Sequence, residues 1–231
     1  MKKVILISGT NRSGSSLLDL MIGNSKNGFS TGELYRLFRP SRPVDILDIN
    51  GLNELGYDTA VIDFWNEIKS KGEKNVYDNL FNSFDGIDFI VDSSKNPIWI
   101  CNQIKYSKNK HYKLINLISY KTPLEFAYSL FKRNRSEYWK RKSWINKHLI
   151  LFYLLQNFFT VKYSNLVKNP SEHLELICKK IGIDYFRGKE NFWKNNSKNF
   201  FLFGSDTLRK SEKLLDYSSQ YDSSYWAYVK N

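Results

Sequence analysis

The segment VILISGTNRSGSSLLDLMIG, residues 4–23, limits the possible folds more than any other part of the chain. Its first residues belong to a short apolar run rich in β-branched side chains, which predicts a buried central strand over residues 2–8. A turn rich in glycine and serine follows, and the apolar residues over 14–23 predict a largely buried helix. Strand, glycine-rich turn and helix in this order build a phosphate-binding loop, so we expect the turn to hold an anion.

The turn lacks the lysine that a nucleotide triphosphatase carries. Gly9 and Gly14 have the G-x-x-x-x-G spacing of such enzymes, but Ser15 stands where the lysine would follow. The available cation is Arg12, whose planar guanidinium can bind a tetrahedral oxyanion through two hydrogen bonds. Main-chain N–H groups and the helix N-terminus complete an anion site. We therefore expect the loop to bind a phosphosulfate without a metal ion. The alternative is an ordinary strand–turn–helix with serine caps.

Strand and helix patterns alternate along the rest of the chain. The predicted strands cover residues 2–8, 87–92, 112–119 and 159–166. The predicted helices cover residues 14–23, 58–71, 74–84, 97–107, 123–135, roughly 136–158, and 169–183. Residues 40–56 are predicted to be an irregular crossing loop, and the chain becomes polar and irregular from about residue 184. This alternation predicts a single α/β domain over residues 1–231, with a P-loop NTPase-like parallel sheet flanked by helices on both faces. Ligands then bind at the carboxyl ends of the strands.

Charge and cysteine content restrict the class of protein. Lys and Arg number 35 and Asp and Glu 23, which gives a net charge of +12. This surplus favours polyanionic partners such as nucleotides, nucleic acid, anionic glycans or membrane surfaces, although it can also reflect genome composition. Cys101 and Cys178 are far apart and predict reduced thiols in a cytoplasmic protein. The three histidines show no metal-ligand spacing, so no metal site is expected; they are His111, His148 and His173.

Two apolar stretches are too short for targeting or spanning a membrane. The N-terminal apolar run ends at a polar turn sooner than the apolar region of a signal peptide does. The stretch over residues 148–161 is shorter than the roughly 20 residues that a spanning helix needs. We expect a buried helix that leads into a strand there, and no transmembrane segment.

Four segments, in order, resemble the PAPS-dependent sulfotransferase superfamily, particularly its bacterial and tyrosylprotein-type branches. GTNRSGSSLLDLMIG followed by GFSTGELYRL is similar to the arginine-containing loop for the 5′-phosphosulfate and the Gly-Glu pair after it. VDSSKNP is similar to the strand-end segment that carries an active-site lysine. LISYKTPLEFAYSLFKR resembles the 3′-phosphate signature, in which a proline is followed six residues later by a serine; Pro123 and Ser129 keep that spacing. VKYSNLVKNPSEHLELICKKIGI resembles the Tyr-Glu-Asp-Leu segment.

The chain departs from this pattern at two places. Lys121 stands where the family usually has arginine, and Thr122 replaces an aspartate, so a point charge replaces a bidentate contact with the 3′-phosphate. Ser164 and Asn165 replace the acidic pair that follows Tyr163. These changes leave the predicted fold intact and affect the expected affinity for the cofactor.

The resemblance implies a role for each matching residue. Glu33 is the expected base for the acceptor hydroxyl, Lys95 stabilises the oxygen that leaves with PAP, and Arg12 contacts the transferring group. Ser93 or Ser94 assists by hydrogen bonding. The expected cofactor-binding residues are Gly9, Thr10, Asn11, Arg12, Ser13, Gly14, Ser15, Ser16, Lys121, Ser129, Tyr163 and Arg209. The segment FFLFGSDTLRKSEK, with Gly204 and Arg209, resembles the family's loop that closes over the 3′-phosphate.

Each assignment has a structural alternative. Glu33 could be a solvated glutamate in a first helical turn, where it would favour the helix dipole. Lys95 could be one of many solvated lysines, Ser129 a plain helix serine, and Tyr163 an ordinary strand aromatic. The segment around Arg209 could be a solvated basic loop.

The first functional hypothesis is a sulfotransferase that moves a sulfuryl group from PAPS to an acceptor hydroxyl, with no metal and no nucleic acid as partners. A carbohydrate acceptor is expected from the resemblance and from tryptophans that could line a sugar cleft or be buried in the core: Trp65, Trp99, Trp139 and Trp144. The acceptor pocket is expected in the variable loops 36–58 and 132–150. The alternatives are a P-loop nucleotide or small-molecule kinase and a non-enzymatic polyanion-binding module. The kinase lacks a convincing magnesium carboxylate, because Asp92 ends a strand but its neighbours match the sulfotransferase pattern.

Overall fold

The computed structural model of the protein describes residues 1–39, 56–132, 138–155, 157–194, 199–211, 224, 225 and 227. The side chains of residues 138–143 and 206 lie outside this description. Almost all of the predicted crossing loop 40–56 therefore lies outside the described residues, as does the side chain of Trp139.

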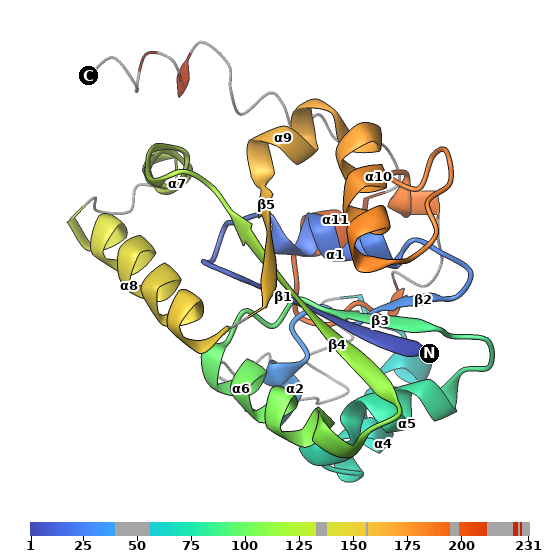
Figure 1. The fold of residues 1–231 in the computed structure, drawn as a ribbon. Coiled ribbons are helices and arrows are strands. Elements are labelled where there is room, and N and C mark those ends of the chain that lie inside the picture. The colour runs from blue at the N-terminus through green and yellow to red at the C-terminus, as the bar shows by residue number, and fades with distance from the viewer. Residues whose placement is uncertain are drawn as a thin grey trace.

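The sheet is parallel throughout and has the strand order β2-β3-β1-β4-β5 (Figure 1). Its strands are β1 (Lys2–Gly9), β2 (Gly28–Ser30), β3 (Phe89–Asp92), β4 (Tyr112–Tyr120) and β5 (Phe158–Lys162). The central strand β1 pairs along its length with β4, from Lys2 opposite Tyr112 to Gly9 opposite Ser119. The parallel α/β sheet predicted from the alternating pattern is thus confirmed.

Two strand predictions need correction. The pattern gave no strand at β2, because three residues, Gly-Phe-Ser, are too short to show a period of two. The predicted strand 159–166 ends at Lys162, where the chain turns into helix α9 (Tyr163–Lys168). Tyr163 therefore begins a helix and is not a strand residue.

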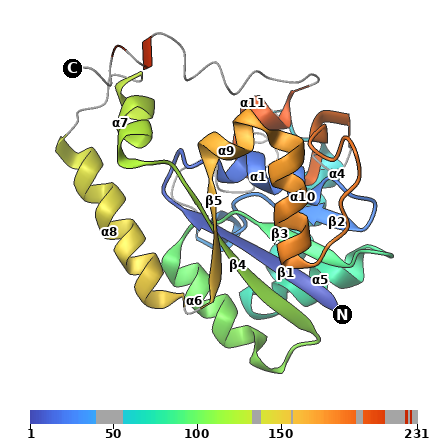
Figure 2. The same ribbon diagram turned by 45° about the horizontal axis from the view of Figure 1, so that its top comes forward.

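Helices cover both faces of the sheet, as the alternation within β1 shows. Val4 and Leu6 point into one core, and Ile5 and Ile7 point into the other. The first core packs against α2 (Tyr35–Phe38), α4 (Thr59–Ser70), α5 (Val76–Ser83), α6 (Pro97–Tyr106) and part of α8 (Tyr138–Leu154). The second packs against α1 (Ser15–Gly23), α9 and α10 (Pro170–Ile181). Figure 2 shows α1 and α10 on one side of the strands and α5 and α6 on the other.

The remaining elements are shorter or lie beside the sheet. They are η2 (Glu73–Asn75), η3 (Ser107–Asn109), α7 (Pro123–Phe131), η4 (Phe192–Lys194) and α11 (Asp206–Arg209). The predicted helices 123–135 and 136–158 correspond to α7 and α8, and α8 ends at Leu154, earlier than predicted. Residues 133–137 of these two predictions lie outside the described residues. The long helix had to end before Phe158, since that residue begins β5.

Local signals explain where several helices begin and end. Proline occupies the first turn of α6, α7 and α10, where its missing N–H has no helical partner to lose. Thr122, which departs from the family pattern, is the N-cap of α7: its hydroxyl accepts from Glu125 N, and the Glu125 carboxylate accepts from Thr122 N. Gly182 ends α10 in a left-handed conformation.

Candidate functional site

The loop after β1 is held tightly against the end of β4. Gly9 has φ +145, and a Cβ atom there would lie 2.3 Å from the Ser119 carbonyl oxygen, so only glycine fits. The Ser119 hydroxyl donates a 2.8 Å hydrogen bond to the Ser13 carbonyl, and Ser13 N donates to Thr10 O. The loop is therefore rigidly placed at the carboxyl ends of the two central strands.

The N-terminus of α1 is open to an anion. Gly14 precedes the helix in a left-handed conformation, no side chain caps the first turn, and no acidic residue lies in it. The Thr10 and Ser13 hydroxyls are buried, and no described residue is hydrogen-bonded to them. Buried polar atoms normally have partners, so these hydroxyls fit a ligand in the loop. Ser15, at the position of the missing lysine, is also buried.

Arg12 and Lys121 supply positive charge beside this loop. Arg12 is exposed and has φ +71, an uncommon conformation for a residue other than glycine and one that recurs at functional sites. Lys121, at the end of β4, is buried. Burial, and then the charge of Arg12, lower the pKa of Lys121 to about 8, against the opposing effect of Glu125. The two cations are thus close enough to repel each other, which favours an anion between them.

Tyr163 forms a wall of the same loop. A Cβ atom on Gly14 would lie 2.0 Å from Cδ2 of the Tyr163 ring, so the ring rests directly on the glycine. The ammonium group of Lys121 lies 4.2 Å from the centroid of this ring. The structure thus brings together Arg12 and Gly14 of the loop with Lys121 and Tyr163, which come from two other parts of the chain.

Glu33 and Lys95 form an ion pair at the ends of β2 and β3. Lys95 Nζ lies 2.6 Å from Glu33 Oε1, and the side chains are 6% and 18% exposed respectively. Arg36 Nη1 lies 3.6 Å from the other carboxylate oxygen. Lys95 has φ +59, so the lysine, like Arg12, is held in an uncommon backbone conformation. Glu33 lies at a strand-to-helix turn, between β2 and α2.

Asp19, on α1, joins the turns that carry these two residues. Its Oδ2 accepts hydrogen bonds from the Ser93 hydroxyl at 2.7 Å and from Gly32 N at 3.2 Å. Burial raises the pKa of Asp19 well above its usual range, an effect that these hydrogen bonds oppose. Sequence analysis missed Asp19; its signal was a single acid within the otherwise apolar helical stretch SSLLDLMIG.

Asp92 holds the turn that carries Lys95 from the other face of the sheet. Its carboxylate accepts from the Tyr77 hydroxyl at 2.6 Å, the Trp99 indole at 2.8 Å and Ser94 N at 2.8 Å, and from the Ser94 hydroxyl. The Ser94 hydroxyl oxygen in turn accepts from Tyr35 N at 3.0 Å. Since Asp92 is buried and already has these donors, it is poorly placed to be a metal carboxylate. Ser93 and Ser94 act within the protein, through Asp19 and Asp92.

Lys147 is a further cation of this region that the sequence did not reveal. It lies on α8 and is half-buried. Burial, and then the charge of Lys95, lower the pKa of Lys147, whereas the charge of Glu33 raises it. The charges of Lys95 and Glu33 thus act on Lys147, although 52 residues of sequence separate it from Lys95.

Two predicted cofactor residues have protein partners of their own. The Ser129 hydroxyl donates to Phe126 O at 2.7 Å within α7. The Arg209 guanidinium lies over the Tyr57 ring, 3.9 Å from its centroid, and donates to Gly56 O. Their contact with a 3′-phosphate stays a prediction.

The tryptophans do not support a sugar cleft. Trp65 and Trp99 are fully buried in the core, and Trp99 donates to Asp92. The Trp144 indole donates to the Lys121 carbonyl. Of the two possibilities left open for Trp65 and Trp99, the structure shows burial in the core, where their apolar surface closes the helix layer over the sheet.

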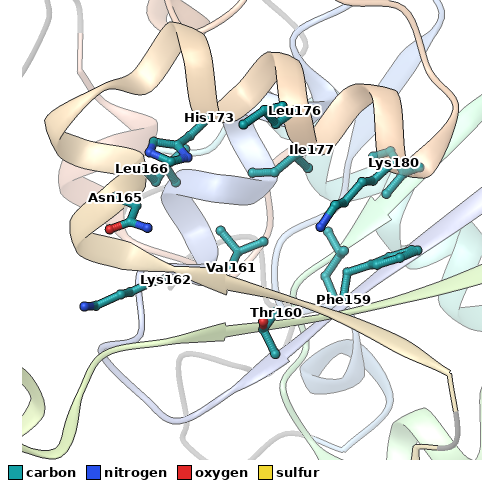
Figure 3. Close-up of a pocket in the computed structure, with 12 residues that line it drawn as sticks. Phe159, Thr160, Val161, Lys162, Asn165, Leu166, His173, Leu176, Ile177 and Lys180 are labelled. Atoms are coloured by element: carbon teal, nitrogen blue, oxygen red, sulfur yellow. The ribbon is translucent and has the colours of Figure 1, made fainter.

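A groove of about 340 Å³ lies elsewhere, between the edge strand β5 and α10 (Figure 3). Val161, Leu166 and Ile177 lie within it, and Lys162 and Lys180 stand at its margins. None of the predicted site residues lines this groove.

Within the described residues, no group of three or more His, Cys, Asp or Glu side chains could hold a metal ion. No described helix is long and apolar enough to cross a membrane.

Comparison with known proteins identifies the fold. No protein-family model and no curated protein matches the chain. Among solved structures, the sulfotransferase domain from the Synechococcus PCC 7002 olefin synthase matches with a TM-score of 0.69 and 17% identity, over 96% of this chain and 86% of that domain. The sulfotransferase domain from the curacin biosynthetic pathway matches with a TM-score of 0.69 and 16% identity, over 100% and 97%. The tyrosylprotein-type branch stays a prediction, but the chain has the fold of the sulfotransferase domains that its motifs resemble.

Proposed function

We propose that this protein transfers a sulfuryl group from PAPS to the hydroxyl of an acceptor. The observation that carries the proposal is the order of groups along one edge of the sheet. Glu33 follows β2, Lys95 follows β3, the anion loop follows β1, Lys121 follows β4 and Tyr163 follows β5. A base, a cation and an anion cradle therefore lie side by side at the edge where parallel sheets bind ligands.

The loop and its neighbours fit the donor. The main-chain N–H groups of Ser15 and Ser16, with the Thr10 and Ser13 hydroxyls, would hold the 5′-phosphosulfate. Arg12 would contact the same group with its guanidinium. Lys121 would bind the 3′-phosphate, and the Tyr163 ring would form one wall of the adenine pocket. Ser129 and Arg209 would complete that pocket if they exchange their present hydrogen bonds for the phosphate.

Glu33 and Lys95 are suited to the chemical step. When bound, the donor supplies a sulfuryl group whose bond to the phosphate oxygen breaks as the acceptor oxygen attacks in line. Glu33 would take the hydroxyl proton of the acceptor. Lys95 would offset the negative charge on the departing oxygen. Arg36 and Lys95 would hold the Glu33 carboxylate in place, because each contacts a different one of its two oxygens.

A kinase is less well supported by the same geometry. Ser15 cannot replace the phosphate-binding lysine, and Asp92 is occupied by Tyr77, Trp99 and Ser94.

Fewer observations bear on the chemical class of the acceptor. A carbohydrate is suggested only by the branch that the motifs resemble, and the two structural neighbours are named for biosynthetic enzymes. We therefore propose a hydroxyl acceptor, with carbohydrate as one candidate class.

Ligand binding separates these functions. A thermal-shift comparison of PAP with ADP–Mg²⁺ should show stabilisation by PAP, and Arg12→Ala should remove most of it. Stabilisation by ADP–Mg²⁺ alone would instead favour the kinase. A polyanion-binding module would lose affinity steeply with salt and would be insensitive to Arg12→Ala, because its binding would be spread over many lysines. Transfer from radiolabelled PAPS to glycans, lipids and small alcohols then tests the activity.

A further inference from the structure

Asp19 lies where helix α1 meets the turns that carry Glu33 and Lys95. Its side chain is fully buried, and Oδ2 accepts from Gly32 N at 3.2 Å and from the Ser93 hydroxyl at 2.7 Å. Gly32 directly precedes Glu33, and Ser93 lies two residues before Lys95. One carboxylate oxygen on α1 therefore contacts both the turn of the proposed base and the turn of the proposed cation.

The two turns are also joined to each other without Asp19. Ser93 N donates to Gly32 O at 2.9 Å, and Lys95 Nζ lies 2.6 Å from Glu33 Oε1. These contacts hold the turns as a unit, but they act between the turns and not between the turns and α1. The hydrogen bonds of Asp19 supply that second constraint, because they place the whole unit relative to the helix.

The same helix begins at the proposed donor site. The main-chain N–H groups of its first residues, Ser15 and Ser16, would hold the phosphosulfate. Asp19 follows Ser15 by four residues, so it lies on the same side of α1, about 6 Å further along the helix axis. A single rigid turn of helix thus connects the donor with the contacts that place Glu33 and Lys95.

A carboxylate is costly at this position. Leu18 and Leu20, its neighbours in α1, belong to the buried core, and an ionised oxygen there loses its hydration. The second oxygen, Oδ1, is buried too, and no described residue donates a hydrogen bond to it. An apolar side chain could fill the same space at lower cost to folding. Such a conflict between polarity and burial is typical of functional sites.

We propose that Asp19 is a positioning residue, whose two hydrogen bonds hold Glu33 and Lys95 at the working distance from the donor on α1. The inference rests on the proposed sulfuryl transfer and adds to it the contact that aligns donor, base and cation. Asp19 itself touches neither donor nor acceptor. The role requires a hydrogen-bond acceptor of this size, so asparagine should serve nearly as well as aspartate.

Turnover and PAP affinity, measured separately, test this role. Asp19→Leu removes the acceptor oxygens and keeps the size of the side chain. Its kcat, for transfer from radiolabelled PAPS to the best acceptor of the screen, should fall roughly 10- to 100-fold, as expected for a small misplacement of reacting groups. PAP affinity should change little, because the first turn of α1 is intact. Asp19→Asn should retain most of the wild-type kcat.

Ser93→Ala is a milder second variant, which keeps the test valid if Asp19→Leu does not fold. It removes only the hydroxyl that links Asp19 to the lysine turn, so kcat should fall in the same direction and by less. In the Asp19→Leu background it should have no further effect, because the hydrogen bond is already absent.

Chemical labelling of Lys95 tests the alignment without an acceptor. Bound PAP would end close to Lys95, so saturating PAP should slow acetylation of this lysine in the wild type, as followed by mass spectrometry. In Asp19→Leu, saturating PAP should protect Lys95 less, whereas Asp19→Asn should behave as the wild type. The Ser30 hydroxyl donates to the main-chain carbonyl of Asp19, so this contact of α1 with the end of β2 is kept in every variant.

Ile22→Ala is the matched control for lost stability. Ile22 is fully buried on the same helix, and its truncation leaves a cavity without removing a hydrogen bond. The melting temperature should decrease, while kcat and the protection of Lys95 by PAP should stay at their wild-type values.

Several outcomes would overturn the role of Asp19 and leave the sulfotransferase proposal standing. They are full turnover or full protection of Lys95 in Asp19→Leu, equal losses of kcat in Asp19→Asn and Asp19→Leu, and a loss of PAP affinity in proportion to kcat. A similar loss of kcat in Ile22→Ala would have the same meaning. If the wild type neither binds PAP nor transfers a sulfuryl group, the proposed function is wrong, and the role of Asp19 fails with it.

Discussion

The ammonium group of Lys95 lies 2.6 Å from the Glu33 carboxylate, and both side chains are largely shielded from solvent. The two residues lie in the turns that follow the neighbouring parallel strands β2 and β3, so the pairing of these strands brings the two turns together. A lysine has three N–H donors, so Lys95 can hold Glu33 with one and direct another toward a departing oxygen. Glu33 and Lys95 can therefore fill their proposed roles, proton removal and stabilisation of the departing oxygen, without separating.

Replacing the proposed base should abolish turnover and spare cofactor binding. In Glu33→Gln the side chain keeps its shape but cannot accept the hydroxyl proton, so kcat should fall about 100- to 10,000-fold. PAP affinity, measured by calorimetry, should change little. Glu67→Gln, at an exposed glutamate paired with Lys71, is the control. Normal turnover by Glu33→Gln would mean that another group is the base.

The pKa of Lys121 predicts how PAP binding depends on pH. Because this pKa is about 8, the lysine loses its charge as the pH rises through that value. PAP affinity should then weaken by roughly 10- to 100-fold, as expected for loss of a charge-assisted hydrogen bond. Lys121→Arg should keep its charge and bind PAP at least as tightly, with no such loss. Calorimetric titrations between neutral and alkaline pH measure this, and an identical pH profile for both proteins would contradict it.

Asp19 should make stability depend on pH in a specific direction. Its folded-state pKa is raised above the unfolded value of about 3.9, so between these two values the folded state binds more protons. Stability from this group is therefore greatest at low pH and decreases as the pH rises toward the folded pKa. Asp19→Asn cannot titrate, so the free energy of unfolding of the wild type should decrease relative to the variant as the pH rises. Urea unfolding at several pH values checks this.

The control for that experiment is Asp63→Asn, an exposed aspartate on α4. Asp92 is present in both proteins under comparison, and its charge contributes, after burial, to the raised pKa of Asp19. Parallel stability profiles for the wild type and Asp19→Asn would show that Asp19 keeps its ordinary titration in the folded state.

Gly14 should be essential because of Tyr163. Gly14→Ala adds a methyl group 2.0 Å from the tyrosine ring and places alanine at φ +88. A left-handed conformation costs a residue other than glycine roughly 1–2 kcal/mol, and the clash with the ring adds to this. In a Tyr163→Ala background, Gly14→Ala should cost only the backbone part. Equal destabilisation in both backgrounds, measured by denaturant unfolding, would show that the ring moves away freely.

Much of the site could be predicted from local patterns. The strand, turn and helix over residues 4–23 gave the anion loop, because glycine spacing and apolar runs are determined by neighbouring residues. The carboxyl-end positions of Lys95 and Lys121 followed from the parallel alternation, which places all such ends at one edge, whereas Glu33 follows a strand that was not among the predicted ones. β2 was missed because three residues carry no readable period, and the end of β5 was misplaced because Tyr163 and its neighbours fit either a strand or a helix.

The sequence by itself therefore determined the order of the motifs, the parallel sheet and the edge at which they meet, since these depend on short-range periodicity and on the geometry of α/β crossings. Only the tertiary structure decided which side chains touch. The packing of α1 brings Asp19 to the turns of Gly32 and Ser93, the helix layer buries Trp65 and Trp99, and the position of α8 brings the Trp144 indole to the Lys121 carbonyl. These contacts join residues far apart in the chain, and the packing of whole helices against the sheet sets them, which no local pattern encodes.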